Sequence, residues 1–210
     1  MISQKGIAAI NPNSVFIRGG NGYRGKRLLD VLCAGFALFV AGLPMILIAL
    51  LVKLTSRGPV LYWSDRVGRN NRIFRMPKFR TMRINTPAVA THLLNRPEQY
   101  LTPIGGFLRK TSLDELPQIG SILMGDMSLV GPRPALFNQD DLVALRTELG
   151  VHMLVPGLTG WAQVNGRDEL PIPQKAQLDA AYLANISLAL DISILWHTFL
   201  KVLRRDGVSH

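Results

Sequence analysis

Residues 31–52 read VLCAGFALFVAGLPMILIALLV, and these 22 consecutive residues carry no charged side chain. A helix of this length is enough to cover the roughly 30 Å hydrocarbon core of a bilayer. A secretory signal is a poor explanation, because its apolar region is shorter, about 7–15 residues, and lies close to the N-terminus. The sequence therefore predicts a protein that enters a membrane.

Both flanks of this apolar segment are basic, and Gly42 and Pro44 lie near its middle. Short flanks rich in Lys and Arg prefer the cytoplasmic side, so a spanning helix would have to export one of them. Pro44 has no N–H to donate to the carbonyl of Val40, and its ring clashes there, so we expect the helix to kink or break. A kinked spanning helix and a re-entrant helix–break–helix both fit these observations.

The chain of 210 residues has 48% hydrophobic and 18% charged side chains, which is typical of a folded protein. It contains 24 Lys and Arg against 14 Asp and Glu, a formal net charge of +10, so its partners are expected to be anionic. A single cysteine, Cys33, excludes a disulfide framework and a Cys-rich metal site. Aromatic residues make up 7% and form no visible stacking platform, so we expect no nucleic-acid partner.

The segment that follows the apolar residues, 57–83, carries eight Lys or Arg side chains against one acid. It contains two strand-like stretches, 60–63 and 73–79, with Gly-Arg-Asn-Asn at 68–71 between them. Strand-like stretches around such turn residues predict a small β-hairpin.

The bases of this segment have two possible roles. They can hold it against anionic lipid, at about 1 kcal/mol per base near the membrane surface. Alternatively, Lys78 and Arg80 face a substrate that carries phosphate. From composition alone the role in lipid binding is the simpler explanation.

The rest of the chain mixes helices and loops. Sequence patterns predict helices over 116–124 and 139–149, and Gly and Pro predict loops at 131–134 and 156–166. Between residues 192 and 203, apolar side chains recur at helical spacing with bases nearby. This last helix can belong to the core or lie as an amphipathic helix at the membrane interface.

An acidic pair, Asp114 and Glu115, follows Arg109 closely and precedes Pro117. Pro117 has no N–H, so a helix through it begins only a few residues earlier, and both carboxylates lie in its first turn, where the helix dipole favours negative charge. Adjacent helical residues point about 100° apart, so one carboxylate can attack an electrophile while the other holds a metal such as Mg²⁺. Taken alone, ordinary first-turn acids with a capping box are the simpler explanation.

Several short motifs follow one another along the chain in a fixed order. They are KRLLD (26–30), GPV (58–60), RVG (66–68), KFRTM (78–82), LRKTSLDELPQ (108–118), GDMSLVGPRP (125–134) and PGLTGWAQVNGR (156–167). Each motif is weak by itself, but the ordered set resembles the bacterial sugar transferase family, the small monotopic phosphoglycosyl transferases. Residues 1–25 fall outside the resemblance and are expected to be an N-terminal extension, too short for the four spanning helices that larger relatives add upstream.

The resemblance implies a reaction. Members of this family move a phosphosugar from a nucleotide-activated sugar, usually a UDP-sugar, to polyprenyl (undecaprenyl) phosphate and release UMP. This is the first membrane step in assembling a capsule, lipopolysaccharide O-antigen or glycoprotein glycan. By the match, Asp114 is the nucleophile that forms a covalent aspartyl phosphosugar intermediate, and Glu115 binds Mg²⁺.

The match also assigns substrate-binding residues. Arg109 corresponds to an arginine near the reacting phosphates. Positions associated with nucleotide-sugar binding match Arg133, Gln163 and Arg167, and within the KFRTM motif we expect Lys78 and Arg80 to bind substrate.

In this family the apolar segment enters and leaves on one membrane face at a proline, and Pro44 matches that proline. We therefore expect a mostly helical α+β fold with a re-entrant membrane helix–break–helix at 26–56, a small β-hairpin and interfacial amphipathic helices. A catalytic domain at 57–210 is expected on the cytoplasmic face of the bacterial inner membrane, as in a monotopic protein bound to membrane lipids. The alternative is a non-catalytic, basic, membrane-tethered adaptor, which would have no need of the acidic pair.

Overall fold

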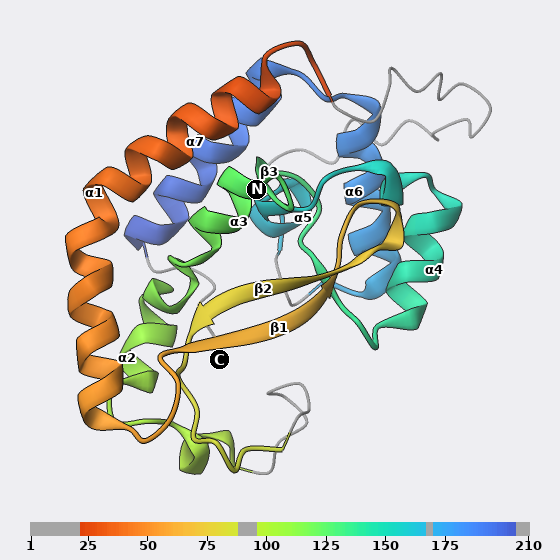
Figure 1. The fold of residues 1–210 in the computed structure, drawn as a ribbon. Coiled ribbons are helices and arrows are strands. Elements are labelled where there is room, and N and C mark those ends of the chain that lie inside the picture. Colours follow the sequence, from red (N-terminus) through yellow and green to blue (C-terminus); the bar gives the residue numbers. More distant parts are fainter. Residues whose placement is uncertain (1–21, 88–95, 167–169, 205–210) are drawn as a thin grey trace.

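The computed structural model of the chain describes residues 22–87, 96–166 and 170–204, and confirms a mostly helical α+β fold (Figure 1). The α-helices are α1 (Lys26–Thr55), α2 (Gly105–Lys110), α3 (Gln118–Met124), α4 (Asp140–Glu148), α5 (Trp161–Val164), α6 (Ile172–Ala184) and α7 (Leu188–Arg204). The strands are β1 (Leu61–Val67), β2 (Ile73–Phe79), β3 (Ser128–Val130), β4 (Ala135–Leu136) and β5 (Gly157–Thr159). Short 3₁₀ turns are η2 (Arg69–Asn71), η4 (Pro97–Tyr100), η5 (Leu113–Glu115) and η6 (Val151–Met153).

The longest element, α1, is one unbroken helix of 30 residues with Pro44 inside it. The expected break of the helix at Pro44 is therefore wrong. The ribbon of α1 changes direction near its middle but stays helical (Figure 1). A proline removes one hydrogen bond and displaces the carbonyl four residues earlier, which bends a helix whose other bonds hold it together. By length and apolar composition α1 can cross a membrane, and its re-entrant path stays a prediction.

One face of α1 packs against the protein and the other is exposed. Ala34, Ile48 and Val52 are buried on the packed face. The exposed face carries large apolar side chains, among them Leu28, Leu32, Phe36, Phe39, Leu43, Ile46, Leu47, Leu50 and Leu54. An exposed apolar surface of this extent is typical of a membrane or protein contact.

The predicted β-hairpin is confirmed. β1 and β2 pair antiparallel, with Tyr62 opposite Lys78, and β4 joins the other edge of β1. Asn70 and Asn71 in the turn have φ angles of 55° and 57°, a left-handed conformation that Asn adopts more easily than most residues. The hairpin is anchored to the helices because α3 packs between α1 and β2, where Ile119 and other apolar side chains form a core.

A second, two-stranded sheet brings two Gly-rich loops together. β3 and β5 pair in parallel, and the predicted loop at 131–134 follows β3 directly. The segment 156–166, expected to be a loop, instead contains β5 and the short helix α5. A Cβ on Gly131 would lie 2.5 Å from the carbonyl oxygen of Val155, so only glycine allows this close approach.

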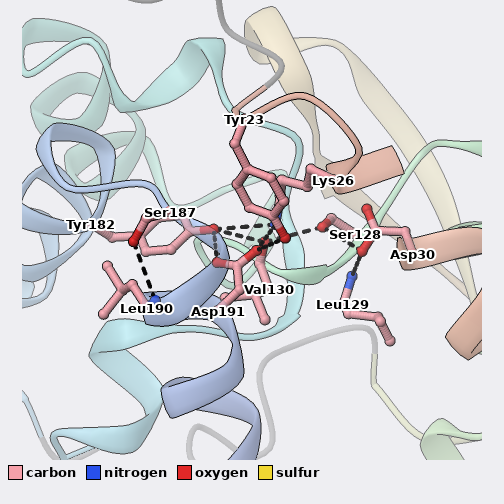
Figure 2. Close-up of polar contacts among 10 residues, drawn as sticks. All are labelled: Tyr23, Lys26, Asp30, Ser128, Leu129, Val130, Tyr182, Ser187, Leu190 and Asp191. Atoms are coloured by element: carbon pink, nitrogen blue, oxygen red, sulfur yellow. Dashed lines mark hydrogen bonds and ion pairs between the residues drawn. The ribbon is translucent and has the colours of Figure 1, made fainter. Parts of the chain in front are cut away.

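A buried polar cluster ties the start of α1 to the two C-terminal helices (Figure 2). Lys26 Nζ lies 2.6 Å from Asp191 Oδ2, and the hydroxyl of Tyr182 donates to Asp191 Oδ1 at 2.7 Å. Tyr23 donates to the same carboxylate at 3.2 Å. Burial and the negative charge of Asp191 raise the pKa of both tyrosines, which keeps their hydroxyls protonated as donors.

One turn further along α1, Asp30 holds the beginning of β3. Its Oδ1 accepts hydrogen bonds from Ser128 Oγ at 3.1 Å and from the backbone N–H of Leu129 at 2.9 Å (Figure 2). α1 therefore holds the strand that leads into the loop 131–134.

Candidate active site

The acidic pair lies on η5, a single 3₁₀ turn between α2 and α3 that packs against β2. Ser112, just before the turn, has a φ of 56°, and its side chain makes no capping hydrogen bond. The capping box is therefore wrong as an explanation for Glu115. The expectation that both carboxylates lie in the first turn of an α-helix through Pro117 is wrong: Pro117 lies immediately before α3, and the carboxylates lie on the separate 3₁₀ turn that precedes it.

Glu115 is held by two cations. Its Oε1 accepts hydrogen bonds from Lys78 Nζ at 2.7 Å and from Arg133 Nη2 at 3.1 Å. Burial raises the pKa of Glu115, but the charges and hydrogen bonds of Arg133 and Lys78 outweigh this and hold it well below its usual range. Glu115 is consequently ionised at neutral pH.

Asp114 is buried, with 8% of its surface exposed. Burial raises its pKa above the usual aspartate range, and the neighbouring Glu115 raises it further, while the charges of Lys78 and Arg109 oppose this. A carboxylate that is poorly stabilised as an anion is more reactive toward an electrophile. The two adjacent carboxylates thus have opposite electrostatic environments.

The structure brings three of the predicted substrate-binding residues to this pair and places Arg80 elsewhere. Lys78 and Arg133 contact Glu115 directly, and Arg109, in the last turn of α2, is close enough to Asp114 to lower its pKa. β2 ends at Phe79, so the strand alternation that would place Arg80 beside Lys78 stops before it.

Arg80 is itself buried at the end of α1. Its Nη2 donates to the carbonyl oxygen of Ser56 at 3.1 Å and to the Ser56 hydroxyl at 2.7 Å. Gly58, with a φ of +114°, leaves room for the guanidinium, because a side chain there would collide with it. This contact joins the hairpin to α1, and the expected role of Arg80 in substrate binding stays a prediction.

The remaining predicted residues, Gln163 and Arg167, come from the segment after β5. Gln163 lies on α5, which packs against α6 and α7, and its amide is buried without a hydrogen-bond partner among the described residues. Arg167 lies outside the described residues.

A divalent cation is expected at Glu115, and the donor set fits one that is shared with a substrate. Within the described ranges no group of three or more His, Cys, Asp or Glu side chains could hold a metal ion alone. Mg²⁺ typically uses one or two carboxylates and completes its shell with substrate phosphates and water. Ionised Glu115, with Asp114 next to it in the chain, provides this kind of partial site.

Sequence reasoning missed the residues that support this site. Arg66 donates to the carbonyl of Pro134 and Arg146 to that of Arg133, the residue that contacts Glu115. Arg66 lies in the RVG motif, from which no role was assigned to it, and Arg146 lies in none of the motifs; a contact to a distant carbonyl leaves no local pattern in the sequence.

The family model for the bacterial sugar transferases matches residues 22–205. The chain belongs to the bacterial sugar transferase family. The match begins four residues before α1 and ends one residue after α7, so it covers the hairpin, the acidic pair and the loop 131–134 together.

Among its family relatives, the chain is 39% identical over 199 residues to an undecaprenyl-phosphate galactose phosphotransferase of Salmonella typhimurium, with 87% of this chain and 41% of the relative covered. It is 40% identical over 185 residues to the uncharacterized sugar transferase EpsL of Bacillus subtilis, with 87% and 89% covered. It is 37% identical over 185 residues to a UDP-glucose:undecaprenyl-phosphate glucose-1-phosphate transferase of Escherichia coli, with 84% and 39% covered. The chain thus spans about two fifths of the length of the Salmonella and Escherichia relatives.

Proposed function

We propose that this protein transfers a phosphosugar from a UDP-sugar to undecaprenyl or another polyprenyl phosphate and releases UMP. The main observation behind the proposal is that two adjacent carboxylates on one turn have different environments. Asp114 is buried and has a raised pKa, whereas Glu115 is kept ionised by Lys78 and Arg133. The names of the Salmonella and Escherichia relatives, which act on undecaprenyl phosphate, support the same reaction class.

In the proposed first step, a carboxylate oxygen of Asp114 attacks the phosphorus next to the sugar. A bond forms between Asp114 and that phosphorus, the bond from phosphorus to the bridging oxygen breaks, and UMP leaves with the electron pair. A carboxylate nucleophile divides a difficult transfer into two easier ones. Lys78, Arg109 and Arg133 supply positive charge around the pair, which offsets the repulsion between the carboxylates and an anionic diphosphate.

In the proposed second step, a phosphate oxygen of the polyprenyl phosphate attacks the same phosphorus. The new bond joins the two phosphates into a lipid diphosphate sugar, and the bond to Asp114 breaks, which regenerates the carboxylate. One site then serves a soluble donor and a lipid acceptor in turn, so the two substrates need not be bound together.

Mg²⁺ is proposed as the cofactor, with Glu115 as its protein ligand. When bound, it neutralises charge on the substrate phosphates. The residues of the chain do the remaining work: Glu115 stays ionised at neutral pH, and Arg133 and Lys78 fix its carboxylate in place.

For location, we propose a monotopic protein on the cytoplasmic face of the bacterial inner membrane. The exposed apolar face of α1 supports insertion into lipid, and α7 presents a second apolar stripe of exposed side chains, Leu188, Ile192, Trp196, Phe199 and Val202. Buried Asp191 and Ile194 face inward, so α7 both contributes to the core and presents the amphipathic surface expected of an interfacial helix.

Cysteine labelling tests this topology. Single cysteines are placed, in a Cys33→Ser background, at exposed Arg24, just before α1, and at exposed Thr55, the last residue of α1. In inverted and right-side-out membrane vesicles, both should react with an impermeant maleimide from the cytoplasmic side alone. Reaction of one of them from the periplasmic side would eliminate the re-entrant arrangement.

The reaction is tested with purified protein, polyprenyl phosphate, Mg²⁺ and a panel of UDP-sugars, with UMP as the measured product. Asp114→Asn should abolish UMP release even without acceptor, because the first covalent step is lost. Asp140→Asn, an exposed aspartate on α4, is the matched control and should retain wild-type rates. Labelled donor without acceptor should leave label on the wild-type protein.

Three outcomes would contradict the proposal. Release of UDP instead of UMP would indicate direct glycosyl transfer. If Asp114→Asn retained more than a few per cent of wild-type activity, the assignment of Asp114 as the nucleophile would be wrong. A protein that binds anionic vesicles but releases neither nucleotide would match the membrane-tethered adaptor.

A further inference from the structure

The loop at residues 131–134, Gly-Pro-Arg-Pro, carries the guanidinium that contacts Glu115. Two of its four residues are prolines, which have no N–H to donate. The N–H of Gly131 donates to the carbonyl of Thr159 at 2.8 Å, but the two prolines can be held through their backbone only by their carbonyl oxygens.

Three donors from other parts of the fold bind these carbonyls. The backbone N–H of Gly157 donates to the carbonyl of Pro132 at 2.9 Å, and Arg66 Nη1 donates to that of Pro134 at 3.3 Å. The carbonyl of Arg133 itself accepts from Arg146 Nη1 at 2.8 Å. The backbone of the residue that faces Glu115 is thus held by a side chain from α4.

Arg146 is in turn held by a buried aspartate on α6. Its Nε and Nη2 both donate to Asp179 Oδ2, at 3.0 and 2.6 Å. The side chains are 9% and 1% exposed, respectively. Because a guanidinium is planar and its donors have fixed directions, the pair with Asp179 determines where Nη1 points.

We propose that Arg146, oriented by Asp179, is a positioning residue that sets the place of Arg133 against Glu115. It touches neither carboxylate of the acidic pair and acts through the backbone of Arg133, whose Nη2 lies 3.1 Å from Glu115 Oε1. A displacement of about 1 Å in such a group can lower a reaction rate roughly a hundredfold. The catalytic part of this inference rests on the proposed phosphosugar transfer.

The competing explanation is that the pair merely joins α4 to α6, which pack against each other. A double-mutant cycle on UMP release separates the two. Arg146→Lys retains the charge but cannot bind both Asp179 and the carbonyl of Arg133 in the same geometry. It should lower kcat by about ten- to a hundredfold in the wild-type background and by less than about threefold in an Arg133→Ala background.

The matched control is a second buried ion pair among the described residues, Lys26 with Asp191, which has the same 2.6 Å separation and a similarly buried aspartate. Asp191→Asn destabilises the protein without touching the loop carbonyls at 131–134, so its effect on kcat should be equal in both backgrounds. Asp179→Asn serves as a second variant in the same cycle if Arg146→Lys does not fold.

Hydrogen–deuterium exchange supplies a readout that needs no activity. Arg146→Lys or Asp179→Asn should raise exchange in a peptide covering 131–138 more than in peptides elsewhere in the protein, and Asp191→Asn should show no such preference for this peptide. Equal losses of kcat in both backgrounds, or unchanged exchange in this peptide, would overturn the positioning role. A wild-type protein that releases no UMP, with exchange still raised in the variant, would refute the proposed function and leave the placement of the loop supported.

Discussion

Replacing Asp191 by Asn should destabilise the protein strongly, because it leaves a buried lysine without its counter-charge. Asp191 is 1% exposed and accepts hydrogen bonds from Lys26, Tyr182 and Tyr23. Asparagine keeps one acceptor oxygen, but it replaces the other with an NH₂ group. That group is a donor and cannot accept the hydrogen bonds that Lys26 and the two tyrosines donate. The remaining positive charge on Lys26, whose side chain is 11% exposed, has little access to water.

The magnitude follows from the burial of both partners. Breaking a buried ion pair from one side costs about 3–5 kcal/mol. For a domain of this size, about 2–4 °C of melting temperature is lost per kcal/mol. Asp191→Asn should therefore lower the melting temperature by roughly 6–20 °C.

The assay is thermal unfolding of the detergent-solubilised protein, followed by intrinsic tryptophan fluorescence. The comparison that isolates the unpaired charge is Asp191→Leu against the double variant Lys26→Met/Asp191→Leu. Removing both charges should recover stability relative to the single variant, although the hydroxyls of Tyr23 and Tyr182 still lose an acceptor at about 1–3 kcal/mol. A double variant no more stable than the single one, or a loss below about 2 °C for Asp191→Asn, would refute this reasoning.

The remaining predictions concern the acidic pair and α1. Glu115 has a folded pKa below its ordinary value of 4.5, so its ionised form stabilises the fold fully above that pH and less as pH falls below it. The difference in melting temperature between wild type and Glu115→Gln should accordingly be largest near pH 7 and shrink in acid. Asp114 must be ionised to attack and has a raised pKa, so UMP release should fall as pH decreases at a point above the usual aspartate range. Lys78→Met removes the positive charge that lowers the pKa of Asp114 most. The pH at which UMP release falls in acid, measured on the residual activity of this variant, should therefore move higher. Pro44→Leu should straighten α1 and give a mixed topology in the cysteine-labelling assay, with activity falling as the spanning fraction rises; unchanged labelling would contradict a role for Pro44 in the bend.

The sequence by itself determined the features that depend on neighbouring residues. An uncharged segment of 22 residues requires an apolar environment wherever it lies, so the long helix at 26–55 was predictable. Two strand-like stretches around Gly-Arg-Asn-Asn close into a hairpin because the turn chemistry is local. The acidic pair and the arginine before it were recognisable because they form one short motif.

The tertiary structure alone decided what depends on residues far apart in the chain. Lys26 meets Asp191 and Arg146 meets Asp179 across long stretches of sequence, and isolated charges give no sign of their partners. β5 forms where Gly and Pro favour a loop because β3 pairs with it, and α5 forms where it packs against α6 and α7. At Pro44 the local rule allowed a kink or a break, and a single lost hydrogen bond is outweighed by the other helical bonds and by packing of the inner face, so α1 stays one helix and bends (Figure 1). β2 ends at Phe79, one residue before Arg80, and Arg80 instead contacts Ser56 at the far end of α1, a partner 24 residues away in the sequence.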